Sequence, residues 1–188
     1  MSFLEFYNII LNTSYLSYDE LPYPVKKINF KKGKIISEYN KVEPYVYFIN
    51  TGIVEMTIKS YVSEKIIDFF FENDMFAGLT SFLTQAPSNV QVTALIDCEL
   101  EMIAYPDLFK SYETSFEANK FSRILFEQAY IRKSNREKDF LSKTAEERYA
   151  EMFQTHSKYI SSIPVNKIAK YLGIHPESLS RIRKKLNS

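Results

Sequence analysis

The chain has 188 residues, of which 45% are apolar and 15% are aromatic, and its formal net charge is +1. A chain of this size and composition can bury a core without disulfide bonds. No apolar run approaches the roughly eighteen residues of a membrane span, and the N-terminus lacks the basic start and cleavage site of a secretory signal. We therefore expect a soluble, cytoplasmic protein that does not associate with a membrane.

The N-terminal region predicts one or two short amphipathic helices. Between Phe3 and Leu21, apolar residues recur at mixed helical spacing, at Phe6, Ile9, Ile10 and Leu16. From Ile28 onward this spacing is lost, so a region of another type follows.

Five short segments between residues 45 and 103 are rich in β-branched and aromatic side chains, which favour strands. They span residues 45–49, 53–58, 65–71, 89–95 and 100–103. Turn residues separate them at 50–52 and 72–74, and Lys32-Gly33 predicts an earlier turn. Alternation is clearest in residues 53–58, where Val54, Met56 and Ile58 would share one face. The region predicts an antiparallel β domain.

A single long helix is predicted from about Ser115 to Leu141, because neither proline nor glycine interrupts this stretch. Its apolar stripe advances in steps of three and four residues and widens on one flank at Ala129. The stripe consists of Phe121, Ile124, Leu125, Gln128 and Ile131. A stripe this narrow suits a partner helix. The alternative is that the helix packs against the chain's own β domain. Different turns of one helix can make the two kinds of contact.

A second helix is predicted to begin after Thr144, a good N-cap with Glu147 in the capping-box position. It would continue to about Lys158. We interpret residues 159–164 as a connector.

The most specific pattern lies in residues 164–186, which have the spacing of a helix-turn-helix. Ile168, Ala169 and Leu172 give its first helix one buried face, and the small side chain of Ala169 admits a close second helix. Gly173 can take the positive φ that reverses the chain. Ile174 can then fill the corner between the helices.

The second helix of this motif would begin at Pro176, where the missing backbone donor costs nothing. Leu179, Ile182 and Leu186 predict its buried side. Short polar and charged residues occupy its outer face and early turns, where they would reach a DNA major groove. These residues, which we predict to bind DNA, are Glu177, Ser178, Ser180, Arg181 and Lys184.

Positive charge is concentrated at the C-terminal end. Residues 163–188 carry six basic residues and one acid, Glu177, so their net charge is +5 and that of the rest is −4. The basic residues are Lys167, Lys170, Arg181, Arg183, Lys184 and Lys185. The split indicates a polyanion-binding end, and we include Lys167 among the DNA-binding residues. Charge alone would favour the alternative, a solvated basic helix.

These patterns resemble the Crp/Fnr family of transcription regulators over nearly the whole chain. The matching helix-turn-helix residues are Ile168, Leu172-Gly173, Glu177-Ser178-Leu179 and Arg181-Ile182. The glycines Gly33, Gly52, Gly78 and Gly173 fall on or close to family turns. The resemblance implies an α+β fold with three parts. The first part, residues 1–110, is an antiparallel β-roll with N-terminal helices, which is a double-stranded β-helix of the cyclic nucleotide-binding type. The second part is a long dimerisation helix over residues 111–141. The third part is a helix-turn-helix domain over residues 142–188.

The resemblance also implies a homodimer that reads a two-fold symmetric site on double-stranded DNA, with RNA polymerase as a candidate partner. Family members read bases with the glutamate and arginine that match Glu177 and Arg181. Arg181 can donate to O6 and N7 of guanine, and Glu177 can accept from N4 of cytosine. Pro176 replaces an arginine commonly used at the start of this helix, so we expect a different operator.

The effector pocket departs from the family pattern. In nucleotide-binding members a Gly-Glu pair and a later Arg-Ser pair hold the ribose and the phosphate, but Gly78-Leu79 and Ser88-Asn89 stand at those places. Arg132 stands where a hydroxyl residue contacts adenine. Losing a charge-assisted contact costs roughly 1.5–3 kcal/mol. We predict a degenerate pocket that does not bind cyclic AMP and that is either inactive or open to an unidentified small molecule. The alternative is that Arg123 or Arg132 supplies the positive charge for the phosphate.

Neither metal chemistry nor catalysis has support in the sequence. Cys98 is the only cysteine, and His156 and His175 stand alone, so the ligands are too few for a zinc or iron–sulfur site. An enzyme on a cupin-like barrel would need a metal triad or a nucleophile with a base, and neither is found. We predict no metal, cofactor or catalytic residue. The main rival function is a cyclic nucleotide-binding signalling module whose C-terminal helices contact proteins rather than DNA.

Overall fold

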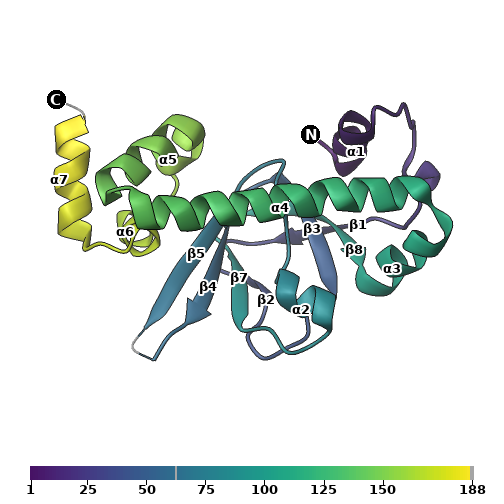
Figure 1. Ribbon diagram of the computed structural model, residues 1–188, viewed down its shortest axis with the longest axis horizontal. Coiled ribbons are helices and arrows are strands. Elements are labelled where there is room, and N and C mark those ends of the chain that lie inside the picture. Colours follow the sequence, from purple (N-terminus) through teal and green to yellow (C-terminus); the bar gives the residue numbers. More distant parts are fainter. Residues whose placement is uncertain (62, 187–188) are drawn as a thin grey trace.

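Two antiparallel sheets form a β-roll beside one long helix (Figure 1). The computed structural model describes residues 1–61 and 63–186, the last without its side chain. One sheet has the order β1 (Lys26–Phe30), β8 (Cys98–Ala104), β3 (Tyr45–Thr51) and β6 (Met75–Phe76). The other has the order β2 (Ile35–Ser37), β7 (Val90–Ala94), β4 (Val54–Lys59) and β5 (Glu64–Phe70). The α+β class and the predicted strands are confirmed, and β1, β2 and β6 are additional.

The two sheets enclose an apolar interior. Val54 and Met56 of β4 lie there with Leu100 of β8, as the alternation in residues 53–58 predicts. The other face of β4 is not exposed, however, because Glu55 and Thr57 are also buried. The first helix of the helix-turn-helix covers part of this face. Alternation within one strand could not indicate a cover that comes from so far along the chain.

The predicted N-terminal helices are confirmed as α1 (Phe3–Leu11) and the 3₁₀ turn η1 (Tyr18–Glu20). Glu101 of β8 is buried and ties the start of α1 to the β-roll. It accepts hydrogen bonds from the Phe3 backbone N–H at 2.6 Å and from Asn50 Nδ2 at 2.7 Å. The α3 helix (Tyr105–Thr114) then leads from β8 into the long helix.

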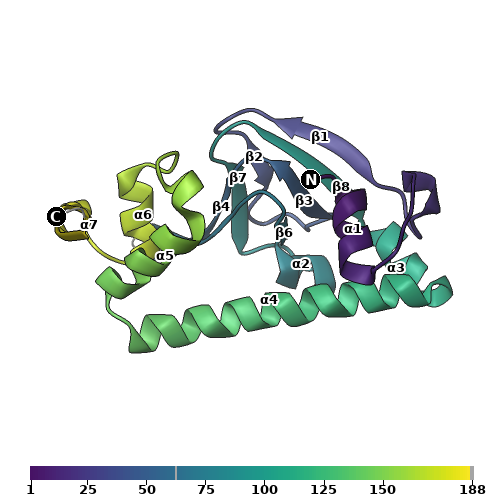
Figure 2. The same ribbon diagram turned by 90° about the horizontal axis from the view of Figure 1, so that it is seen from above.

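The long helix is α4 (Phe116–Ser142), and it runs along one side of the whole molecule (Figure 2). Its N-cap is Ser115, whose side chain accepts from the Ala118 backbone N–H. Phe121 and Leu125 pack against the chain's own domain, whereas Ile131 is 55% exposed. The predicted stripe therefore divides between an inner and an outer face. No helix within residues 1–61 and 63–186 is both long and apolar enough to cross a bilayer.

The C-terminal part consists of α5 (Ala145–Ile160), α6 (Val165–Leu172) and α7 (Pro176–Leu186). The predicted capping box of Thr144 and Glu147 opens α5, which ends two residues later than expected. Gly173 has a φ of +73° and joins α6 to α7, so the predicted helix-turn-helix is confirmed. Leu179 is fully buried, and the side chain predicted to be buried at Leu186 lies outside the described part.

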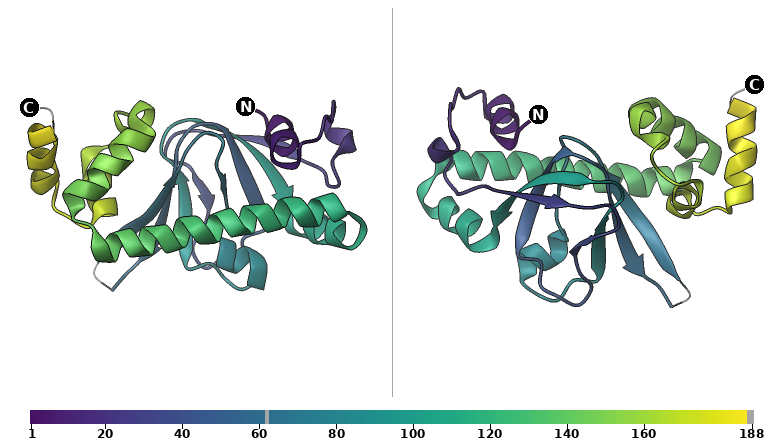
Figure 3. Two further views of the ribbon diagram at one scale, coloured as in Figure 1. Left: turned by 45° about the horizontal axis from the view of Figure 1, so that its top comes forward. Right: turned by 180° about the vertical axis from the view of Figure 1, so that it is seen from behind.

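The C-terminal helices share a core with the β-roll instead of standing apart from it (Figure 3). Phe69 and Phe71 at the end of β5 pack with Ile168 of α6. The rings of Phe69 and Tyr171 lie 5.2 Å apart, centre to centre. The division at residues 110 and 141 remains a prediction, but the cluster shows that the third part does not build its core alone.

His156 of α5 packs against this shared core. Its ring stacks on Phe71 with a centroid distance of 4.1 Å, and burial lowers its pKa from the usual 6.5. The fold therefore disfavours the protonated ring, and the stability due to the neutral ring is lost as pH falls below 6.5 toward the lowered value. We expect the thermal unfolding midpoint to decrease between about pH 7.5 and about pH 5, more in the wild type than in His156→Phe. Identical pH profiles of the two proteins would contradict the assignment.

Candidate nucleic-acid interface and sensor cavity

The outer face of α7 presents the residues predicted to bind DNA. Each of the five is exposed: Glu177, Ser178, Ser180, Arg181 and Lys184. Neither Arg181 nor Lys184 forms an ion pair or a hydrogen bond with the described part of the chain. The Ser180 hydroxyl donates to the Pro176 carbonyl at 3.0 Å. The helix stands at the end of the molecule opposite α1 (Figure 1).

Lys167 lies apart from that face. Its Nζ pairs with a carboxylate oxygen of Glu55, a residue only 5% exposed on β4. Lys185 similarly pairs with Glu146 of α5 at 2.7 Å. Acidic residues of β4 and α5 thus neutralise the charge of two of the six basic residues. A phosphate contact from Lys167 stays a prediction, and it requires the pair with Glu55 to open.

Residues of α4, α5 and α6 hold the turn that precedes α7. The Ile174 N–H donates to the Ala169 carbonyl at 3.0 Å, which closes the turn after α6. Arg148 of α5 donates to the Leu172 carbonyl at 3.0 Å, and its guanidinium lies 4.6 Å from the ring centre of Phe140 on α4. Arg148 thus contacts both the end of α4 and the turn that precedes α7.

A buried carboxylate occupies the region that the resemblance assigns to phosphate binding. Glu43 is 1% exposed, and its side chain accepts from the Gly78 N–H at 3.4 Å. Its own N–H donates to the Ser81 hydroxyl at 3.0 Å, at the start of α2 (Leu79–Thr84). Burial raises the pKa of Glu43. The hydroxyl of Ser88 is used locally, because it donates to the Val90 carbonyl at 2.9 Å, and Asn89 is exposed.

Arg132 is committed to structural contacts. It donates to Asp68 and to Asp74, each at 3.1 Å, and to the Phe69 carbonyl at 2.6 Å. Its guanidinium also lies 4.6 Å from the ring centre of Phe70. Burial works against the charge of Arg132, but the two carboxylates raise its pKa. The side chain therefore holds α4 against β5 and offers no free charge.

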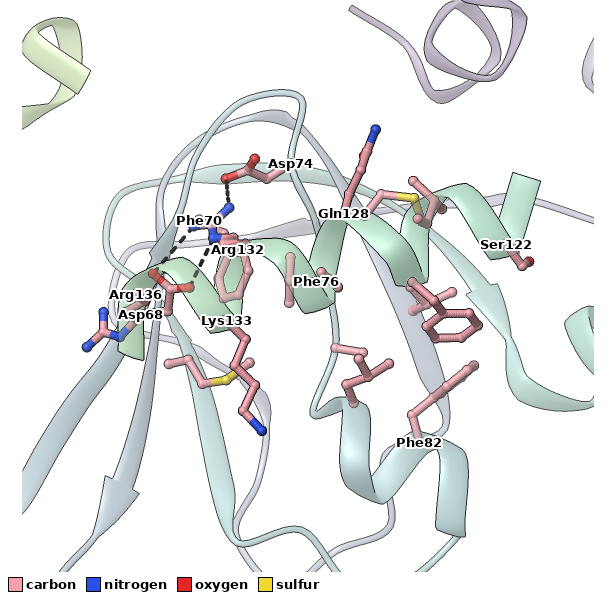
Figure 4. Close-up of a pocket in the computed structure, with 18 of the residues that line it drawn as sticks. Asp68, Phe70, Asp74, Phe76, Phe82, Ser122, Gln128, Arg132, Lys133 and Arg136 are labelled. Carbon is pink, nitrogen blue, oxygen red and sulfur yellow. Dashed lines mark hydrogen bonds and ion pairs between the residues drawn. The ribbon is translucent and has the colours of Figure 1, made fainter. Parts of the chain in front are cut away.

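A cavity of about 910 Å³ lies between α4 and the β-roll (Figure 4). Leu79 and Arg132 line it, whereas Gly78, Ser88 and Asn89 do not. The predicted pocket residues are thus divided between the cavity wall and the neighbourhood of Glu43. No three His, Cys, Asp or Glu side chains in the described ranges are arranged to hold a metal ion.

Residues 27–115 match the cyclic nucleotide-binding domain family. No curated protein sequence matches the chain. Three solved structures are similar over most of their length. FixK2 from Bradyrhizobium japonicum is 18% identical, with a TM-score of 0.76 over 87% of this chain and 85% of its own. A CooA mutant from Carboxydothermus hydrogenoformans is 15% identical, with a TM-score of 0.68 over 95% and 82%. A Crp/Fnr family transcriptional regulator from Eubacterium rectale is 17% identical, with a TM-score of 0.69 over 96% and 82%.

The chain has the Crp/Fnr-type fold. Within this fold the β-roll is the cyclic nucleotide-binding-like part and α5 to α7 are the helix-turn-helix part.

Sequence reasoning missed the acids that surround the cavity and the Gly78 region. Glu43 precedes Pro44 and belongs to no periodic pattern, so nothing in the sequence marked it. Asp68 is a single charge inside the apolar run 66–71, and this was a usable signal of a buried ion pair. Its partner on α4 is 64 residues away, so the pairing required the fold.

Proposed function

We propose that the chain is a sequence-specific DNA-binding transcriptional regulator of the Crp/Fnr type. The observation that carries this proposal is the outer face of α7, where Arg181 and Lys184 are exposed and form no ion pair or hydrogen bond with the described residues. A helix this size fits the major groove, and a bidentate arginine distinguishes guanine from the other bases. RNA polymerase remains a candidate partner of such a regulator.

The active species in this proposal is a homodimer formed through α4. The outer face of α4 exposes apolar side chains near the middle of the helix, with Tyr130 at 72% and Ile131 at 55% exposure. Apolar side chains that recur along one helix face favour a protein interface. Two copies of α7 would then meet successive major grooves, which sets a two-fold symmetric operator.

Selection of bound duplexes from a random pool tests the function directly. The full-length protein should enrich a two-fold symmetric site whose half-sites lie about one helical turn apart, or a multiple of it. A pool that stays random after repeated selection, at a salt concentration where weak binding is competed away, would contradict sequence-specific binding.

We also propose that the regulator does not respond to cyclic AMP. Leu79 and Ser88 provide no charge for the ribose and phosphate, and Arg132 is held by two aspartates. In addition, an anionic phosphate near Gly78 would compete with the Glu43 carboxylate for the same donors. Bringing a second anion beside a buried carboxylate is unfavourable.

Titration with cyclic AMP and cyclic GMP decides between this proposal and the rival signalling module. We expect no saturable binding up to about millimolar nucleotide, because each lost charge-assisted contact weakens affinity at least about tenfold. Saturable micromolar binding by isothermal calorimetry, without DNA binding, would instead support the rival.

A further inference from the structure

The cavity between α4 and the β-roll has an apolar body (Figure 4). Aromatic and aliphatic side chains form most of its wall, among them Phe6, Phe70, Phe76, Leu79, Phe82 and Phe121. A volume of about 910 Å³ is at the upper end of the range for small-molecule sites. A wall of this composition favours a ligand with a large apolar body over a nucleotide.

The cavity is long as well as apolar. It follows α4 from Ser122 past Arg136, and 14 residues of α-helix span about 21 Å. A compact ring system would leave much of this length empty. An extended chain would contact the wall throughout.

The two ends of the cavity differ in charge. Near Ser122 the wall includes Tyr23 and Tyr112, and these neutral groups cannot offset a full charge. The charged lining residues gather at the other end: Asp68, Asp74, Arg132, Lys133, Arg136 and Glu137. An ionic group of the ligand must therefore lie at this second end.

Within the charged end, Lys133 is the available cation. Asp68 and Asp74 are bound to Arg132, and the guanidinium of Arg136 lies over the ring of Tyr171 on α6. Lys133 forms no ion pair with the described part of the chain, and its side chain extends away from the Arg132 cluster (Figure 4). An unpaired amine beside an apolar wall suits the anionic head of an amphipathic molecule.

We propose that this cavity binds an extended apolar acid of the long-chain fatty acid class, with its carboxylate on Lys133. Binding would also reach the helix-turn-helix, because Arg136, one turn further along α4, stacks 4.2 Å from the ring centre of Tyr171 on α6. This second step rests on the proposed function, whereas ligand binding itself does not.

Fluorescence titration of the full-length protein with cis-parinaric acid, in the absence of DNA, tests the binding. We expect saturable binding of one probe per chain and displacement by oleate. Oleyl alcohol, which has the same chain but no charge, should need at least about tenfold higher concentration. Equal displacement by the acid and the alcohol would overturn the assignment of the carboxylate to Lys133.

Two variants test whether the ligand binds in the cavity. Lys133→Gln should weaken oleate about tenfold and leave oleyl alcohol unchanged, whereas Lys138→Gln, an exposed lysine of α4 outside the cavity, should change neither. Ala129 lines the cavity from α4, so Ala129→Trp should abolish binding of both ligands while circular dichroism shows a folded chain. Undiminished probe binding by a folded Ala129→Trp protein would overturn the site.

DNA binding is measured separately, with and without oleate, on the selected operator. A change in operator affinity that is lost in Lys133→Gln supports the coupling to α6. An unchanged operator affinity despite saturable oleate binding overturns the coupling alone. Loss of all operator binding, with oleate binding intact, rejects the DNA-binding proposal and leaves the ligand site standing.

Discussion

Replacing Arg181 by alanine should weaken binding to the selected operator by about 1–3 kcal/mol and relax the preference at one base pair of each half-site. Arg181 is exposed on the second turn of α7, where a guanidinium can donate to O6 and N7 of guanine. Random duplexes lack a guanine at a fixed place, so their affinity should fall much less. Fluorescence anisotropy with operator and scrambled duplexes measures both changes.

Lys184→Ala is the matched control on the same helix. Lys184 is also exposed and also lacks a partner in the described part of the chain, but its amine serves as a point charge for a phosphate. Operator and scrambled duplexes should weaken alike, and the slope of log affinity against log salt should decrease by about one. If both variants weakened both duplexes equally, the base-reading role of Arg181 would be wrong.

Local patterns predicted the secondary structure well. The capping box at Thr144 and the Gly173 turn use interactions within a few residues, so the sequence contains all that determines them. The short strands β1, β2 and β6 were not predicted. Their stability depends on pairing with β8, β7 and β3, and three residues such as Ile35–Ser37 carry too little periodicity to be recognised.

The same difference between local and long-range interactions decides which parts of the candidate site could be predicted. Exposure of Arg181 and Lys184 followed from the 3.6-residue period of one helix. The position of Lys167 did not, because its partner Glu55 is on a strand 112 residues earlier. At the expected effector pocket, the sequence predicted which family charges are missing. The fold was needed to show that Glu43 is buried beside Gly78 and that two aspartates hold Arg132.

The shared core implies that the β-roll and the helix-turn-helix unfold together. Ile168 and Leu172 of α6 lie in one cluster with Ile66 of β5, and the buried Glu55 pairs with Lys167 across the same boundary. Removing one partner of a buried ion pair destabilises a protein by much more than the intact pair stabilises it. The boundary is therefore held mainly by apolar contact, and its strength can be measured with a single side chain.

Phe69→Ala should lower the free energy of unfolding by about 3–5 kcal/mol. Phe69 is 1% exposed at the end of β5 and packs against Tyr171 of α6, so its removal leaves a cavity between the two parts. Phe116→Ala, which truncates a ring that is 82% exposed, should change stability by less than about 0.5 kcal/mol. Urea unfolding followed by circular dichroism measures both. A loss below about 1 kcal/mol for Phe69→Ala would mean that the C-terminal helices are not docked on β5 in solution.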